Sequence, residues 1–125
     1  MKEVYEEVGL TYETLKYYCN EELVPNHKRD KNNYRIFDEK DIAWIKGLMK
    51  LRACGMTIKD MKTYMHLCIE GISTIAERKE MLNHTKKNLE LEMTRIEESI
   101  EYITEKNHYY DQIISGEIEY QSNLN

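Results

Sequence analysis

The spacing of apolar residues changes near residue 74 and divides the chain into two parts. Before that point, apolar residues recur at helical spacing in short segments that Gly, Pro and polar residues interrupt. After it, a seven-residue repeat continues without Gly or Pro to Ser115. The pattern predicts a mainly all-α protein with a globular domain at residues 1–70, a long helix at 73–115 and a flexible tail at 116–125.

Two short helices are predicted near the start of the chain, over residues 2–8 and 12–19. Gly9 between them can adopt the positive φ of a helix C-cap, and the hydroxyl of Thr11 can cap the second helix. Two short helices joined by a tight turn are the sequence signature of a helix-turn-helix motif. The buried side of the second helix is expected to contain Leu15 and Tyr18.

The next segment predicts a β-ribbon wing. Residues 23–25 begin an extended stretch, polar residues at 26–33 turn the chain, and Tyr34–Phe37 returns it. Aromatic and β-branched residues in this last stretch favour extended backbone. Such a wing is expected to lie beside the helix pair.

Two further helices are predicted after the wing. Asp38 and Asp41 have the spacing of an acidic N-terminal cap, and the helix that they begin continues to Gly55. Thr57 can cap a fourth helix, which Gly71 ends. The globular domain therefore contains four helices.

The long helix carries the heptad pattern of a coiled coil. Thr74 and Glu77 have the spacing of a capping box at its start. One apolar position recurs every seven residues. A second position lies four residues beyond it, and it is polar in the first two repeats and mostly apolar in the later ones. We therefore expect a dimerisation helix that pairs most tightly between Met93 and Ile114. The predicted interface consists of Ile75, Leu82, Leu89, Met93, Ile96, Ile100, Ile103 and Tyr110.

Composition argues against a large compact core. Charged residues make up 33% of the chain and the mean hydropathy is -0.75, so an elongated or oligomeric protein is expected. No apolar stretch approaches the length of a bilayer span, and no signal-peptide pattern opens the chain. Three cysteines without CxxC spacing suit a reducing compartment. We expect a cytoplasmic protein without a membrane partner.

Charge is distributed unevenly along the chain. Residues 1–70 carry 12 Lys and Arg against 12 Asp and Glu, whereas residues 71–125 carry 6 against 11. Basic residues of the first part gather between Lys16 and Arg35, where they provide a positive surface for phosphates. The chain has no Gly-rich phosphate loop and no Ser/His/Asp arrangement. We therefore expect neither an enzyme nor a bound cofactor or metal.

Three motifs, in this order, resemble those of the MerR family of transcription regulators. Thr14–Tyr18 (TLKYY) is similar to the recognition helix of the family, Asn33–Phe37 (NYRIF) to its wing, and Gly55–Thr57 (GMT) to its second-wing turn. The resemblance runs from Met1 to about Leu67 and continues, in layout, through the long helix. Three motifs at family spacing are specific evidence, whereas one alone is weak.

The resemblance implies a winged helix-turn-helix domain followed by an antiparallel coiled coil that makes a homodimer. Such dimers bind pseudo-palindromic promoter operators and distort an overlong spacer so that RNA polymerase engages both promoter elements. Lys16 replaces the usual arginine, which keeps the charge but loses the bidentate fork. Glu22 and Asn33 stand where relatives often carry glycine. The residues that the resemblance places against double-stranded DNA are Tyr12, Glu13, Lys16, Tyr17, Lys28, Arg29, Lys31, Tyr34, Arg35 and Arg52.

The resemblance is to small family members without an effector-binding domain, because the tail after the long helix is short. Some of these respond to aldehydes or other stress through a cysteine in the third helix. That position is Lys50 here, and Cys54 at the end of the same helix is the candidate thiol sensor. Its alternative role is that of a half-buried structural thiol. The cysteine positions of metal-sensing members hold none here, which argues against metal sensing.

Two other functions stay open at this point. One is a coiled-coil module that binds protein and not DNA, and the other is a simple repressor. Phosphate contacts predict a steep loss of affinity with ionic strength, which separates DNA binding from the first alternative.

Overall fold

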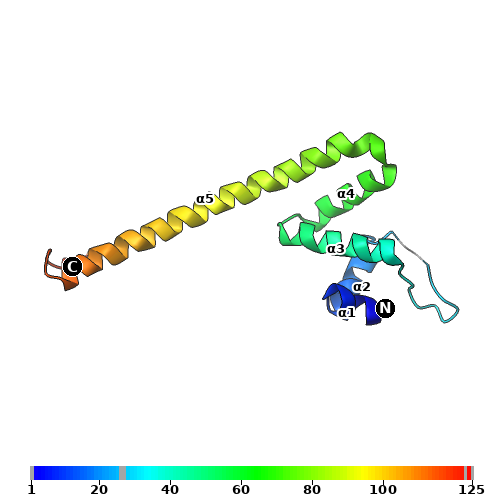
Figure 1. Ribbon diagram of the computed structural model, residues 1–125, viewed down its shortest axis with the longest axis horizontal. Coiled ribbons are helices and arrows are strands. Elements are labelled where there is room, and N and C mark those ends of the chain that lie inside the picture. The colour runs from blue at the N-terminus through cyan, green and yellow to red at the C-terminus, as the bar shows by residue number, and fades with distance from the viewer. Residues whose placement is uncertain (1, 26–27, 123, 125) are drawn as a thin grey trace. The chain divides into compact units, whose positions relative to one another are not determined.

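The computed structural model describes residues 2–25, 28–122 and 124, and most of them lie in helices (Figure 1). The helices begin and end close to the positions that the sequence predicts, and the all-α fold is confirmed. Residues 26 and 27 of the predicted wing lie outside the described residues. In chain order the elements are α1 (Lys2–Val8), α2 (Tyr12–Asn20), α3 (Glu39–Ala53), α4 (Ile58–Glu70), the 3₁₀ helix η1 (Ile72–Thr74) and α5 (Ile75–Ile114).

The chain divides into two compact units, residues 1–86 and residues 87–125. The first unit contains α1 to α4, η1 and the first turns of α5, and its core brings together apolar side chains from every one of the first four helices. The segment between α2 and α3 adds two buried residues to this core. The buried apolar cluster consists of Val8, Leu15, Tyr18, Leu23, Val24, Ile45, Leu48, Met56 and Met61.

Trp44 of α3 fixes the segment that leads from α2 into the wing. Its indole Nε1 donates a hydrogen bond of 2.7 Å to the carbonyl oxygen of Leu23. A buried backbone carbonyl without a partner would cost free energy, and the indole satisfies it while its ring packs on the core. The wing therefore starts from a fixed point on α3.

The N-terminus of α3 is the capping box that the sequence predicts. The Asp38 carboxylate accepts from the backbone N–H of Asp41 at 2.9 Å, and the Asp41 carboxylate accepts from the backbone N–H of Asp38 at 2.8 Å. The hydrogen bond from the Asp41 backbone, together with the nearby charge of Lys28, lowers the pKa of the Asp38 carboxyl below its usual value. The charged form of Asp38 is therefore favoured by folding.

This lowered pKa predicts a loss of stability in acid. The stabilisation is present above the unfolded-state value of about 3.9, and it is lost as the pH falls through the lower folded-state pKa. Asp38→Asn keeps a good N-cap but cannot titrate, so its melting temperature should fall less steeply than that of the wild type below about pH 4. Asp38→Ala should lower the melting temperature by a few degrees at neutral pH. If the melting temperatures of the wild type and of Asp38→Asn fall equally steeply below about pH 4, the role of the Asp38 carboxylate is contradicted.

The start of α5 differs from the predicted capping box. Thr74 ends η1, and its hydroxyl donates to the carbonyl oxygens of Leu67 and Gly71, at 2.6 and 2.8 Å. The Thr74 side chain is thus directed back to the end of α4, and no N-cap hydrogen bond with Glu77 forms among the described residues. The partial negative charge at the C-terminus of α4 favours a donor at these carbonyl oxygens, each of which can accept a second hydrogen bond.

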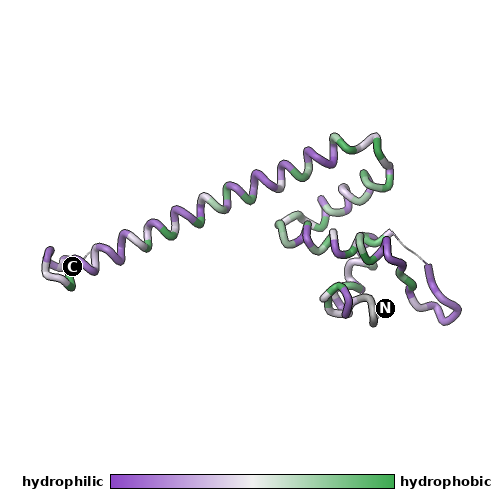
Figure 2. The backbone as a smooth tube through the Cα atoms, viewed as in Figure 1, coloured by the Kyte–Doolittle hydropathy of each residue, from purple (hydrophilic) through white to green (hydrophobic). Residues whose placement is uncertain are grey.

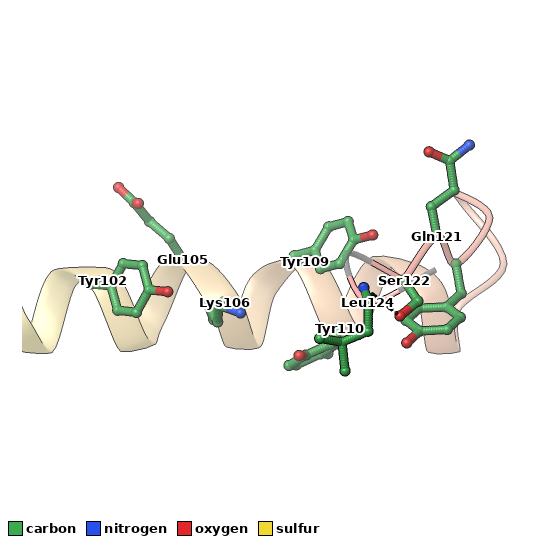
Figure 3. A pocket seen from close by; sticks show the side chains of 9 residues that line it. Tyr102, Glu105, Lys106, Tyr109, Tyr110, Gln121, Ser122 and Leu124 are labelled. Carbon is green, nitrogen blue, oxygen red and sulfur yellow. Dashed lines mark hydrogen bonds between the residues drawn. The ribbon is translucent and has the colours of Figure 1, made fainter.

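The second unit consists of the rest of α5 and the C-terminal tail. Hydrophobic and hydrophilic residues alternate along α5 (Figure 2), and none of its residues is buried in the single chain. After Gly116 the tail lies beside the last turns of the helix, where tyrosines surround a shallow cavity of about 590 Å³ (Figure 3). No described helix combines the length and the apolarity needed to span a bilayer.

Candidate nucleic-acid interface

Helix α2 has one buried and one exposed face. The Thr11 hydroxyl caps its start by accepting from the backbone N–H of Thr14 at 3.2 Å. Leu15 and Tyr18 are buried in the core, as predicted. The residues on the opposite side, at spacings of one helical turn, share the exposed face. This face presents Tyr12, Glu13, Lys16 and Tyr17.

The described part of the wing is a loop with one bridge, between Arg29 and Arg35, so the predicted β-ribbon is wrong in extent. Two backbone hydrogen bonds join its arms, from the Ile36 N–H to the Lys28 carbonyl at 3.0 Å and from the Asp30 N–H to the Tyr34 carbonyl at 2.9 Å, and side chains hold the turn between them. The Asp30 carboxylate accepts from the backbone N–H groups of Asn32 and Tyr34, at 2.8 and 3.0 Å. The Arg29 guanidinium donates to the Asn33 carbonyl at 2.8 Å. Asx turns of this kind stabilise short polar loops by hydrogen-bonding backbone groups a few residues ahead.

Arg35 joins the wing to α2. Its Nη2 donates to the side-chain carbonyl oxygen of Asn20 at 3.3 Å. Burial raises the pKa of the neighbouring Cys19 thiol, while the charges of Arg35 and Arg29 act in the opposite direction, so both guanidiniums lie near the end of α2. The predicted contact residues of α2 and of the wing therefore belong to one surface. Sequence reasoning missed Asn20, for which the only signal is a polar side chain at a helix end.

The lysines of this surface differ in their environments. Lys28 forms an exposed ion pair with Asp38, with 3.5 Å between Nζ and the carboxylate, which reduces its net charge toward a ligand. Lys16 and Lys31 are exposed and have no ion pair with any described residue. Tyr34 is 68% exposed at the turn of the wing. Lys16, Lys31 and Tyr34 are therefore open to a phosphate backbone.

Arg52 lies at the other end of α3, at the turn into α4. Its Nη1 donates to the carbonyl oxygen of Met56 at 3.0 Å, across the turn that Gly55 makes with a φ of 94°. Only glycine adopts this conformation without strain. Arg52 is exposed, and the hydrogen bond fixes its guanidinium beside the second-wing turn.

A family model described as "MerR HTH family regulatory protein" matches residues 1–68. The chain belongs to the MerR family. A regulator from Haemophilus influenzae, described as an uncharacterized HTH-type transcriptional regulator, is 31% identical over 105 residues, which cover 84% of this chain and 78% of the relative. The HTH-type transcriptional regulator AdhR of Bacillus subtilis is 36% identical over 87 residues, which cover 70% of this chain and 62% of AdhR.

Two solved MerR-family structures are similar over most of the chain. HiNmlR, a MerR family regulator that lacks the sensor domain and was crystallised bound to promoter DNA, has 29% identity and a TM-score of 0.72, with 90% of this chain and 89% of HiNmlR covered. A MerR family transcriptional regulator from Listeria monocytogenes has 27% identity and a TM-score of 0.79, with 92% and 87% covered. This chain is therefore a MerR-type transcriptional regulator, and the relatives named here are regulators rather than enzymes.

The two positions where MerR relatives often carry glycine have left-handed backbone in this chain as well. Glu22 has a φ of 59° and Asn33 a φ of 67°. Asparagine tolerates this region better than most residues, whereas glutamate is strained there. Both turns thus adopt a backbone conformation that favours glycine, although neither position holds one.

The cysteines of this MerR protein lie in different surroundings. Cys54 is exposed at the C-cap of α3, while Cys19 and Cys68 are half-buried. The half-buried alternative for Cys54 is therefore wrong, and an accessible thiol is compatible with a sensor, which stays a prediction. Among the described residues, no group of three His, Cys, Asp or Glu side chains is placed to hold a metal ion.

Proposed function

We propose that the protein acts in the cytoplasm as an antiparallel homodimer that binds an inverted-repeat promoter operator and distorts the promoter spacer for RNA polymerase. The face of α2 with Tyr12, Glu13, Lys16 and Tyr17 would read the major groove. The wing, with Arg29, Lys31, Tyr34 and Arg35, and Arg52 at the end of α3 would contact phosphates on the flanks. Phosphate contacts position such a domain, and side chains in the groove give it sequence preference.

The exposed face of α2 is the observation that carries this proposal. A capped helix with its apolar side in the core presents two tyrosines, a carboxylate and an ammonium group to solvent. Arg35 holds the basic wing against the end of the same helix. A polar helix face beside a positive loop matches the width and charge of a DNA major groove with its flanking phosphates.

The apolar stripe of α5 supports a homodimer. Helix α5 has 40 residues and none of them is buried, so beyond its first turns tertiary packing within one chain does not stabilise it. In the first unit, Met81 and Thr85 line the side of α5 next to α4, whereas Ile75 and Leu82 are exposed. The stripe is therefore available to a second α5 helix, and burial of its side chains would supply the stabilisation that the single chain lacks.

Charge favours an antiparallel pair over a parallel one. Residues 75–94 carry four Lys and Arg and four Glu, whereas residues 95–114 carry two Lys and Arg and five Asp and Glu. A parallel pair would place the two acidic halves together. An antiparallel pair places each acidic half beside a neutral half that contains Lys79 and Lys86 in the stripe, which reduces the repulsion.

The salt dependence of DNA binding tests the phosphate contacts. Between about 50 and 200 mM salt, the dissociation constant should rise by at least about tenfold, because several phosphates are neutralised. Lys31→Gln in both protomers should reduce the slope of log K against log salt by about two, since each lost contact contributes about 0.9. Fluorescence anisotropy with a labelled DNA duplex measures both effects.

Lys106→Gln is the matched control. It removes the same charge as Lys31→Gln, but Lys106 lies in the second unit, away from the surface proposed to contact DNA. An equal change of slope in both variants would mean that Lys31 acts through net charge alone. An affinity that does not change with salt would leave the protein-binding module as the better explanation.

A further inference from the structure

We propose that Thr74 and Arg78 form a clamp that fixes the first turn of α5 to the end of α4 and thereby sets the half-site spacing that the dimer accepts. The inference rests on the proposed function as a homodimer on an inverted repeat. Thr74 and Arg78 lie outside the surface proposed to contact DNA, and their role is to position that surface relative to the start of α5.

The clamp consists of hydrogen bonds to the carbonyl groups of Leu67, in the last turn of α4, and of Gly71, its C-cap. The Arg78 guanidinium donates from Nη2 to the carbonyl oxygens of Gly71 and Leu67, at 2.6 and 3.2 Å. Its Nε donates to the Thr74 hydroxyl at 3.0 Å, and that hydroxyl donates to the same two carbonyls. Thr74 is only 3% exposed and is the one buried polar residue among the described residues. Hydrogen bonds to a charged group in a half-buried setting are stronger than neutral ones.

The clamp explains why the positive charge of Arg78 lies in the first turn of α5. A positive charge in the first turn of a helix is unfavourable, because the N-terminus already has partial positive charge. The C-terminus of α4 has the opposite partial charge, and its carbonyl oxygens can accept a further hydrogen bond beside their backbone donors. The C-terminus of α4 therefore stabilises the Arg78 charge, although Arg78 is a residue of α5. Burial raises the pKa of Tyr64 in α4, and the Arg78 charge acts against that rise, which also places the guanidinium beside α4.

The clamp spans the turn at which the chain changes direction. Gly71 has a φ of 104° and separates α4 from η1, and its conformation is one that other residues rarely adopt. Without side-chain contacts, a single glycine followed by one short helical turn would be a flexible joint. The hydrogen bonds from Thr74 and Arg78 to the Leu67 carbonyl cross Gly71 and hold the joint in one conformation.

A fixed joint has a consequence for operator recognition. The first unit carries the DNA-contacting surface, and α5 carries the apolar stripe that pairs with the second copy in the proposed dimer. The angle at the joint therefore determines the separation of the two DNA-contacting surfaces. Helix-turn-helix dimers select half-sites by this separation, and a mismatch must be compensated by deforming DNA or protein.

Operators with altered spacing test the clamp. The wild type should bind best at one half-site spacing and lose about tenfold or more in affinity when two base pairs are added or removed. Arg78→Lys keeps the charge but cannot form the forked contacts, so the same changes should cost it less than about threefold. Thr74→Ser keeps the hydroxyl and should behave like the wild type. Arg95→Lys, on the exposed surface of α5, is the control for a conservative arginine substitution.

Each other outcome overturns a different statement. If Arg78→Lys keeps the spacing profile of the wild type, the clamp does not set the spacing. A uniform loss of affinity at all spacings, together with a lower melting temperature, would assign Arg78 a purely structural role and also overturn the inference. If the wild type itself shows no preferred spacing, the proposed homodimer on an inverted repeat is wrong, and the inference falls with it.

Discussion

Replacing both Ile100 and Ile103 with aspartate is expected to make the protein monomeric and to reduce its affinity for an inverted-repeat operator by at least about 100-fold. Both side chains lie in the apolar stripe of α5, at 61% and 56% exposure in the single chain. In the proposed coiled coil they would be buried, and burying four unpaired carboxylates per dimer is prohibitively costly. A monomer loses the gain in affinity that two linked half-site contacts provide. Light scattering and fluorescence anisotropy measure the two effects.

Leu91→Asp is the matched control for this variant. Leu91 is also 61% exposed on α5, but it lies outside the heptad stripe. The control should stay dimeric and keep its operator affinity within about threefold, since surface substitutions away from contacts have small effects. A dimeric Ile100→Asp/Ile103→Asp variant, or a monomeric Leu91→Asp variant, would show that the stripe is not the interface.

Ile45→Ala is expected to lower the free energy of unfolding of the first unit by about 2–5 kcal/mol. Ile45 of α3 is fully buried at 0% exposure, in the cluster that joins α1, α2 and α4. Total stabilities of small domains are about 5–15 kcal/mol, so this loss removes a large fraction and should release α2 with the face proposed to contact DNA. Operator affinity should fall in parallel with the folded fraction.

Urea denaturation followed by tryptophan fluorescence measures this effect, because Trp44 is the one tryptophan of the chain and packs on the core. Ile69→Ala, at a 61% exposed position of α4, is the control, and it should change the stability by less than about 0.5 kcal/mol. Equal effects of the two substitutions would contradict the placement of the core.

The sequence predicts those features whose cause lies within one helical turn. Asp38 and Thr57 cap their helices because side chain and backbone partner are three residues apart. The exposed face of α2 follows from helical periodicity, and so does the stripe of α5. The resemblance to MerR regulators added the residues proposed to contact DNA, most of which are exposed on α2 and the wing.

Features that depend on distant segments were not predictable in the same way. The hydrogen bond between Arg35 and Asn20 joins residues fifteen positions apart, and nothing in the local pattern of either marks it. Thr74 fits an N-cap by spacing, but the carbonyl groups of Leu67 and Gly71 at the end of α4 compete for its hydroxyl. In the described part of the wing one bridge forms, and Asp30 and Arg29 hold the turn through side-chain bonds that the extended pattern of the segment does not show.

Selection of bound duplexes from a random DNA pool at moderate salt is the most direct measurement of the proposed function. A homodimer with one α2 helix in each half-site predicts enrichment of an inverted repeat with a fixed spacing. The position of that repeat in promoters near the gene then separates two modes of control. A repeat inside an overlong promoter spacer indicates that the protein distorts the DNA, and a repeat elsewhere in the promoter indicates simple repression. Enrichment of single, unpaired sites, or of no sequence at all, would contradict the proposed function.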